Sequence, residues 1–212
     1  EKIAVGKNIK EGVIDLDFGI TKNLKNLADF KNTTPDKLTI CLLERERHDH
    51  IVKDAKQLGT KIKFISDGDV AGAIYAGIEE FNVDIYLGVG GAPEGVLAAA
   101  AIKCLGGQFQ ARLVLSNDHE IDKAKKMGIK DLKKKYYIND IVKDDVLFCA
   151  TGVTGGDLLQ GIEILDNGFY QSETYVLHHA SKLNKKIINK FKIWSTSPSL
   201  VESGFYPIST KI

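Results

Sequence analysis

The stretch from Val83 to Leu113 constrains the fold more than any other part of the sequence. An apolar run of strand type ends in Gly88, Gly90 and Gly91. Pro93 then opens an alanine-rich segment that has the composition of a helix. We therefore predict a strand, a tight turn and a helix start. Glycines in such a turn let the backbone approach a ligand closely, and the N–H groups of a helix N-terminus favour an anion, most often a phosphate.

Glu94 lies in the first turn of this predicted helix. Its carboxylate would repel a phosphate at the same helix end unless a divalent cation lay between them, so one interpretation is a site that holds phosphate and metal together. The other is that Glu94 only complements the helix dipole, as acidic residues commonly do there. The residues alone leave both interpretations open.

Two further strand–helix units precede this stretch. Residues 38–43 and 61–66 have strand patterns, and residues 50–58 and 69–80 have helix patterns. Three such units in series predict an α/β fold with a layered parallel sheet and helices on its faces. Ligands in such sheets bind beyond the carboxyl ends of the strands, so we expect the segments ERERH, SDGD and GVGGAPEG to converge on one edge.

The remaining segments complete the predicted organisation. We interpret residues 1–37 as a joining segment in which Thr21 caps a helix, and residues 38–194 as the α/β domain. Within this domain, Asn117 to Met127 reads as a charged helix. Residues 170–194 contain two strand-like runs around a polar turn, which predicts a C-terminal hairpin. Residues 195–212 read as an irregular tail.

Composition limits the possible partners. The chain has 212 residues, of which 43% are hydrophobic, and 29 basic residues balance 28 acidic ones to a net charge of +1. This balance argues against nucleic acid or a membrane surface as a partner. The longest apolar stretch is far shorter than a membrane span, and no signal pattern opens the chain. Because the chain begins at Glu1 and not at methionine, we interpret Glu1 as a cut end.

The cysteines and histidines indicate no metal site of their own. Cys41, Cys104 and Cys149 lie in apolar surroundings without C-x-x-C spacing, which favours buried, reduced thiols in a cytoplasmic protein, with no disulfide and no zinc site. The five histidines show no ligand spacing. We interpret Asp157, within TGGDLL, as a helix cap.

Arg45 and Arg47 are candidates for binding a phosphate. They alternate along a segment that we expect to be extended, so both can point the same way and offer planar bidentate donors. The alternative is an ordinary solvated surface, in which Glu44 and Glu46 neutralise the two arginines.

Asp67 and Asp69 flank Gly68 directly after a predicted strand. Helix capping explains one aspartate well and the second poorly. A pair of acceptors separated by a glycine suits the neighbouring hydroxyls of a sugar or a metal ion.

Three separated motifs, ISDGDVAGAI, GVGGAPEGVLAAAAIKCLGG and CATGVTGGDLLQGI, occur in an order that resembles the class II fructose-1,6-bisphosphatases. The resemblance runs from the first residue to about Trp194. The acidic motifs that carry most of the metal ligands in that family, and that come earlier in its sequences, are absent. The resemblance therefore implies that this chain is the C-terminal part of such an enzyme, with a sugar-phosphatase-like fold and a sugar-phosphate-binding domain at 38–194.

The resemblance also implies roles for individual residues. Contacts to the substrate fall on seven positions, with Glu46 replacing the proline usual in the family: Arg45, Glu46, Arg47, Asp67, Gly68, Asp69 and Gly91. Glu94 becomes a ligand of a divalent metal, Mn²⁺ or Mg²⁺. The catalytic residues are not identified in this chain, and its missing N-terminal portion is an expected partner.

The implied reaction is metal-dependent hydrolysis of fructose-1,6-bisphosphate to fructose-6-phosphate and phosphate in gluconeogenesis, by a homo-oligomer. The 212 residues alone are expected to be inactive, because one carboxylate cannot organise a multi-metal centre. Two alternatives remain: a non-catalytic module for sugar-phosphate binding or assembly, and sedoheptulose-1,7-bisphosphatase activity.

Overall fold

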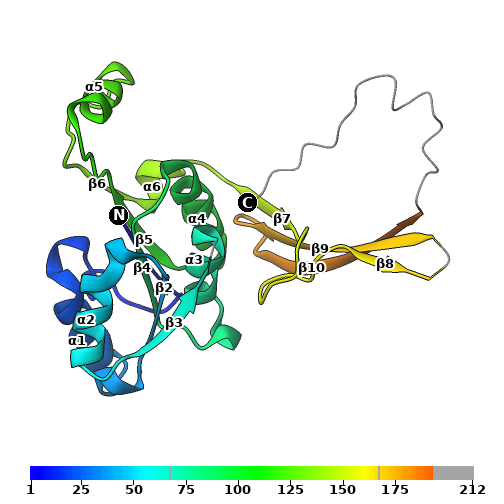
Figure 1. Cartoon of the computed structure of the whole chain (residues 1–212), viewed down its shortest axis with the longest axis horizontal. Helices are drawn as coiled ribbons and strands as arrows, with labels where there is room; N and C mark the ends of the chain where they lie inside the picture. Colours follow the sequence, from blue (N-terminus) through cyan, green and yellow to red (C-terminus); the bar gives the residue numbers. More distant parts are fainter. Residues whose placement is uncertain (67, 167, 193–212) are drawn as a thin grey trace. The chain divides into compact units, whose positions relative to one another are not determined.

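The computed structural model describes residues 1–66, 68–166 and 168–192, which form two units (Figure 1). The first unit comprises residues 1–148 and 177–183, and the second comprises residues 149–176 and those from 184 onward. Asp67 and the predicted tail at 195–212 lie outside the described residues.

The first unit is built on a six-stranded sheet in the order β3-β2-β4-β1-β5-β6. The strands are β1 (Lys2–Val5), β2 (Thr39–Leu43), β3 (Lys61–Ile65), β4 (Ile85–Gly88), β5 (Gln108–Arg112) and β6 (Lys135–Tyr137). The helices between them are α1 (Gly19–Phe30), α2 (Asp49–Gln57), α3 (Asp69–Gly77), α4 (Ala92–Leu105), α5 (Asp118–Lys126) and α6 (Ile138–Ile141). The α/β fold with helices on the faces of a sheet is confirmed.

The predicted parallel pairing is confirmed for the three strand–helix units, and the rest of the sheet is antiparallel. Strands β2, β3 and β4 are parallel, as their strand–helix units require. Strand β1 lies between β4 and β5 and is antiparallel to both, and β6 is antiparallel to β5. The antiparallel strand β1 places its first residue, Lys2, opposite Gly88, the last residue of β4. The start of β1 therefore lies at the edge where the parallel strands end.

Helices cover both faces of the sheet (Figure 1). On one face, apolar residues of β1, β2 and β4 form a core with residues of α1 and α2. Its members include Ile3, Leu24, Leu27, Ile40, Leu42, Ile51 and Ile85. On the other face, α3 and α4 pack against each other and α3 contacts β1, β2 and β4. A Cβ at Gly72 of α3 would lie 2.8 Å from the Tyr86 ring, so the small residues of α3 permit this close approach.

Residues 1–37 differ from the expected joining segment. They provide the central strand β1, in which all four residues are buried, and helix α1, whose Leu24 and Leu27 are fully buried. Helix α1 begins at Gly19 and not at Thr21, because the side chain of Asp15 accepts a hydrogen bond from the Asp17 nitrogen and starts a 3₁₀ turn, Leu16–Phe18, that leads into the helix.

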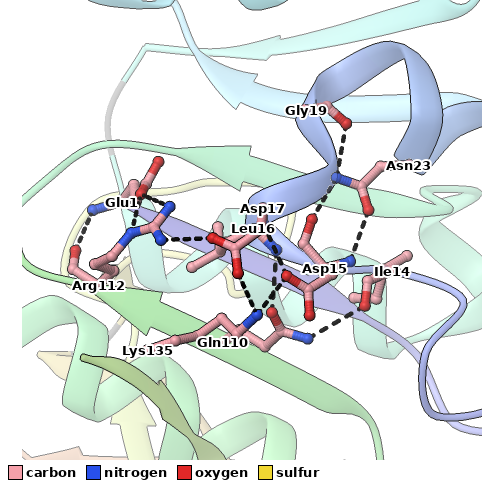
Figure 2. Close-up of polar contacts among 10 residues, drawn as sticks. All are labelled: Glu1, Ile14, Asp15, Leu16, Asp17, Gly19, Asn23, Gln110, Arg112 and Lys135. Carbon is pink, nitrogen blue, oxygen red and sulfur yellow. Dashed lines mark hydrogen bonds and ion pairs between the residues drawn. The ribbon is translucent and has the colours of Figure 1, made fainter. Parts of the chain in front are cut away.

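Charged side chains fasten the N-terminal segment to β5 and β6 (Figure 2). Arg112 bonds the carboxylates of Glu1 and Asp17 at 2.7 and 2.6 Å, and Lys135 bonds those of Asp15 and Asp17 at 2.5 and 2.7 Å. Lys135 is the last of three consecutive lysines, 133–135, and these two ion pairs make it part of the fold.

The charged helix predicted at residues 117–127 is confirmed. It is α5, and the Asn117 side chain caps it by accepting from the Glu120 nitrogen at 3.0 Å.

The second unit carries most of a four-stranded sheet in the order β10-β9-β7, with β8 paired to β9. Its strands are β7 (Leu147–Thr151), β8 (Glu163–Leu165), β9 (Phe169–His178) and β10 (Leu183–Lys192). The predicted C-terminal hairpin is confirmed as β9 and β10. No helix follows β7 in the described residues, so Asp157 lies in an exposed bend and does not cap a helix.

Loop residues 152–162, from the third glycine-rich motif, fold back on the second unit's sheet. Leu158 and Leu159 are buried, and the Lys186 ammonium donates to the Leu158 carbonyl at 2.6 Å.

The structure also bears on two further expectations, which concern the burial of the cysteines and the length of the helices. Cys41 and Cys104 are buried and form no disulfide, and burial raises the pKa of Cys104, but Cys149 is exposed, contrary to the expectation for it. Among the described residues, every helix is too short or too polar to cross a membrane.

The carboxylate of Asp17 gives the ion network a dependence on pH. Hydrogen bonds from Lys135 and then Arg112 lower the pKa of Asp17 to about 2, from an ordinary value of 3.8. A carboxylate whose pKa is lower in the folded state stabilises the fold above its unfolded pKa, and this contribution is lost as the pH falls through the folded value. We expect the midpoint of urea unfolding to fall more for the wild type than for Asp17→Asn between about pH 4 and pH 2. Parallel curves for the two proteins would contradict this assignment.

Candidate functional site

Three loops meet at the edge of the sheet where β2, β3 and β4 end. Their described residues are 44–48, 66 with 68–69, and 89–94. Arg45 from the first loop donates to the Ser66 carbonyl at 2.7 Å, and Arg47 donates through Nε to the Val89 carbonyl at 2.8 Å. The predicted convergence of these segments is therefore confirmed.

The sequence predicted an extended backbone around both arginines, and the structure differs from this prediction. Glu46–His48 is a 3₁₀ turn that leads into α2, and only Arg45 has extended backbone angles. The two arginine side chains therefore have different partners. Arg45 donates from its two terminal nitrogens to the carbonyls of Glu44 and Ser66. Within the described residues Arg47 donates only through Nε, and its terminal nitrogens have no acceptor among those residues. Both arginines and Glu46 are exposed.

The environment of Asp69 differs from that of an exposed side chain that binds a sugar. Its side chain is 6% exposed, Oδ2 is 2.5 Å from the Lys2 ammonium, and Oδ1 accepts from the Tyr86 hydroxyl at 2.8 Å. Burial raises the pKa of Asp69, but the hydrogen bonds from Lys2 and Tyr86 outweigh it and leave the pKa below its ordinary value. Burial beside this carboxylate raises the pKa of Tyr86, which stays a donor. Asp69 is therefore a buried, ionised group that joins β1, α3 and β4.

Gly68 precedes Asp69 in the left-handed region, with φ at 89°, where glycine is favoured over residues with a Cβ. It allows the chain to turn sharply from β3 into α3. Asp67, which was expected to act with Asp69, lies outside the described residues.

The glycine-rich loop after β4 lies directly over these groups. A Cβ at Gly90 would overlap Oδ2 of Asp69 and lie 3.2 Å from the Lys2 ammonium nitrogen. A Cβ at Gly91 would overlap Oε2 of Glu94. Glycine is needed at Gly90 because the buried, ion-paired Asp69 carboxylate occupies the space that a side chain would fill, whereas the exposed Glu94 side chain beside Gly91 can move aside. Gly91 is also the N-cap of α4, which begins at Ala92 with Pro93 in its first turn.

Glu94 is exposed in the first turn of α4 and has no partner among the described residues. An exposed carboxylate beside N–H groups fits a single ligand of a hard divalent cation. Within the described ranges, no three His, Cys, Asp or Glu residues gather where they could hold a metal ion. The described residues therefore fit one metal ligand and do not by themselves make up a metal centre.

Sequence reasoning missed three residues of this edge: Lys2, Tyr86 and His48. Lys2 and Tyr86 carry polar groups within apolar strands, which is the signal that could have revealed them. His48 was considered as a possible ligand and set aside, yet it is fully buried beneath the loop, where Nε2 accepts from the Val89 nitrogen at 2.9 Å.

These features describe an α/β protein whose candidate ligand site combines arginine donors, a glycine-rich loop at a helix N-terminus and one exposed carboxylate. The chain belongs to the family of bacterial fructose-1,6-bisphosphatases, glpX-encoded, whose sequence model matches residues 1–191.

Three relatives show the extent of this similarity. The chain is 39% identical over 201 residues to "Fructose-1,6-bisphosphatase class 2" of Haemophilus influenzae, an alignment that covers 88% of this chain and 60% of the relative. It is 34% identical over 171 residues to "D-fructose 1,6-bisphosphatase class 2/sedoheptulose 1,7-bisphosphatase" of a Nostoc species and of Synechococcus elongatus, covering 74% of this chain and 50% of each relative. The chain thus spans between half and three fifths of the length of these relatives.

The loop geometry predicts opposite effects for two alanine substitutions. Gly90→Ala is expected to destabilise the protein by about 1–3 kcal/mol, the usual cost of overpacking, because the new methyl group must displace the Asp69 carboxylate. Gly95→Ala is the matched control within α4, where the methyl group would lie 3.7 Å from the Lys2 side chain, at ordinary contact distance. It is expected to leave stability unchanged or to raise it by about 0.5–1 kcal/mol. Urea unfolding of both variants measures this, and equal effects would show that the loop is not packed on Asp69.

Proposed function

We propose that this chain forms the sugar-phosphate-binding part of an enzyme that hydrolyses fructose-1,6-bisphosphate to fructose-6-phosphate and phosphate, with a divalent metal, in gluconeogenesis. The observation that carries the proposal is the bond from Arg47 to Val89. It joins a phosphate-binding type of side chain to the glycine loop that ends at Glu94, in a chain that belongs to the fructose-1,6-bisphosphatase family.

Within this proposal, the substrate lies over the edge formed by the three loops. Arg47 offers its terminal nitrogens to the phosphate that does not react, since a guanidinium matches phosphate geometry with two parallel bonds. Arg45 joins the segments that follow β2 and β3, and Glu46 adds a negative charge beside both arginines. Backbone groups of Gly68 and Gly91 contact the sugar, and Asp67 and Asp69, which flank Gly68 in the sequence, are further proposed contacts.

Mg²⁺ or Mn²⁺ would supply the activation of water and the neutralisation of the leaving oxygen. In this chain Glu94 would hold one such ion, since it is an exposed carboxylate with no described partner. The remaining ligands are proposed to come from the portion of the relatives' length that this chain does not span. This portion is therefore a partner of the site, and the 212 residues alone are proposed to be inactive.

A related activity on sedoheptulose-1,7-bisphosphate is the second candidate, because two relatives carry both activities in their names. The two substrates share the bisphosphate that Arg47 would recognise, and they differ in the length of the sugar. A purely non-catalytic binding module is the third candidate, and it predicts binding of sugar phosphates without phosphate release at any chain length.

We also propose a cytoplasmic location and a homo-oligomeric assembly. The location is supported by three cysteines that form no disulfide. The assembly follows only from the resemblance to the family.

The role of Arg47 predicts a loss of affinity that depends on the second phosphate. Arg47→Ala is expected to weaken binding of fructose-1,6-bisphosphate by about 1.5–3 kcal/mol, or one to two decades in Kd, because a charge-assisted contact is lost. Arg47→Lys keeps the charge but not the planar pair of donors, so it restores only part of this loss. Calorimetric titration of each variant with the bisphosphate measures the effect.

Fructose-6-phosphate and fructose-1-phosphate serve as comparison ligands in the same titrations, because each lacks one phosphate. Wild type and Arg47→Ala are expected to have the same affinity for the monophosphate that lacks the phosphate bound by Arg47. Arg45→Ala is the control variant, since both terminal nitrogens of Arg45 are already bonded to carbonyls, and it is expected to have the smaller effect. If Arg47→Ala binds the bisphosphate with unchanged affinity, the loop at residues 44–48 is an ordinary solvated surface and not a phosphate site.

Phosphate release tests the catalytic part of the proposal. With Mg²⁺ or Mn²⁺, the 212 residues are expected to release phosphate from fructose-1,6-bisphosphate negligibly, whereas the protein extended to the relatives' length turns over. In the longer protein, Glu94→Gln is expected to lower metal-dependent turnover by at least about ten-fold while the melting temperature stays unchanged. A lower melting temperature with full activity would instead assign Glu94 to the dipole of α4.

A further inference from the structure

The backbone of Val89 is held on both sides of its Cα. Its N–H donates to Nε2 of His48 at 2.9 Å, and its carbonyl accepts from Nε of Arg47 at 2.8 Å. Adjacent side chains of one short turn therefore hold the two peptide groups on either side of Val89 in the glycine-rich loop. The loop has no helix or strand hydrogen bonds at this point, so these two contacts fix its position.

The hydrogen bonds of His48 define its protonation state. Because the Val89 N–H group is a donor, Nε2 must be the unprotonated acceptor. Nδ1 lies 2.8 Å from the Leu43 carbonyl, which can only accept, so Nδ1 carries the proton. His48 is thus a neutral imidazole that bridges the end of β2 and the glycine-rich loop. Its side chain is fully buried, which separates it from any ligand in solvent.

The surroundings leave the histidine ring little freedom to move. A Cβ at Gly88 would lie 3.6 Å from Cε1 of His48 and 3.0 Å from the Tyr86 hydroxyl oxygen. The same hydroxyl donates to Asp69, whose carboxylate lies beneath Gly90. The loop from Gly88 to Gly91 therefore rests on His48 at one end and on Asp69 at the other.

We propose that His48 is a positioning residue of the ligand site. By holding the Val89 N–H group, it restricts the backbone that carries the neighbouring Val89 carbonyl, to which Arg47 is bonded, and so helps to set where the terminal nitrogens of Arg47 lie relative to Glu94. A buried neutral imidazole suits this task because it accepts and donates along two fixed directions. The identity of the ligand rests on the function proposed above, but the grip on the loop does not.

Amide replacements of His48 separate the two hydrogen bonds. Glutamine carries a carbonyl oxygen near the place of Nε2, so His48→Gln can still accept from Val89. Asparagine carries a nitrogen near the place of Nδ1, so His48→Asn can keep only the bond to Leu43. His48→Leu removes both bonds and keeps the ring's apolar volume approximately. If positioning acts through Val89, glutamine rescues and asparagine does not.

The first measurement is hydrogen exchange of the Val89 amide in the ligand-free protein. We expect protection in the wild type and in His48→Gln, and exchange about ten-fold faster or more in His48→Asn and His48→Leu. The amide of Ile40, within β2, is the internal control and is expected to stay protected. Equal protection of Val89 in all four proteins would overturn the proposal, and so would equal loss in glutamine and asparagine variants. If His48→Leu does not fold, the glutamine–asparagine pair still decides the question.

The second measurement is titration with fructose-1,6-bisphosphate and with inorganic phosphate. His48→Asn is expected to bind the bisphosphate about ten-fold more weakly than the wild type, and His48→Gln within about two-fold. A purely structural role of His48 would instead lower the melting temperature of both variants and leave the affinity of the folded protein unchanged, which contradicts the proposal. If the wild type binds neither ligand, the proposed function fails, and the exchange data still test the positioning on their own.

Discussion

The buried ion pair between Lys2 and Asp69 is the contact on which the candidate site depends. It joins the first strand of the chain to the start of α3, and the Tyr86 hydroxyl adds β4 to the same group. Removing two charges from water is costly, and breaking such a pair by deleting one partner typically costs about 3–5 kcal/mol, because the other charge stays buried and unpaired. The two oxygens of Asp69 are both satisfied here, so the pair can support the loop that lies above it.

The antiparallel strand β1 makes that contact possible. In a wholly parallel sheet the first residue of each strand lies at the opposite edge from the ligand site, and Lys2 could not reach Asp69. Because β1 runs against β4, Lys2 pairs with Gly88 and arrives at the edge where β2, β3 and β4 end. Its aliphatic stem lies beside α4, where a Cβ added at Gly95 would be 3.7 Å from it, at ordinary contact distance.

The site divides its polar groups into a supporting layer and an exposed layer. Lys2, Asp69, Tyr86 and His48 are buried and bonded to one another or to the backbone. Arg45, Arg47 and Glu94 are exposed above them, and only Arg47 and Glu94 keep groups that no described residue uses. Preorganisation of this kind lowers the cost of binding, because the loop is ordered before a ligand arrives. One exposed carboxylate also sets a limit on what the described residues can do with a metal.

Local patterns in the sequence determined the strand, glycine turn and helix at residues 83–105, the capped helix α5 and the C-terminal hairpin. They determined that β2, β3 and β4 run parallel to one another, though not the order in which these strands lie. They also determined that three loops meet at one edge, since parallel strands end together. Periodicity, caps and turn residues act over a few positions, so the amino-acid sequence alone is enough to identify them. The same patterns identified Arg45, Arg47, Asp69, Gly91 and Glu94 as candidates by residue type.

Only the tertiary structure decided what these residues do within the chain. It inserted residues 2–5 as a central antiparallel strand, paired Asp69 with a lysine 67 positions away, and turned the ERERH segment into a 3₁₀ turn. It also made His48 a neutral bridge to Val89, 41 positions further along the chain. Contacts at such separations depend on how the strands are ordered in the sheet, and neither local propensity nor charge pattern specifies that order.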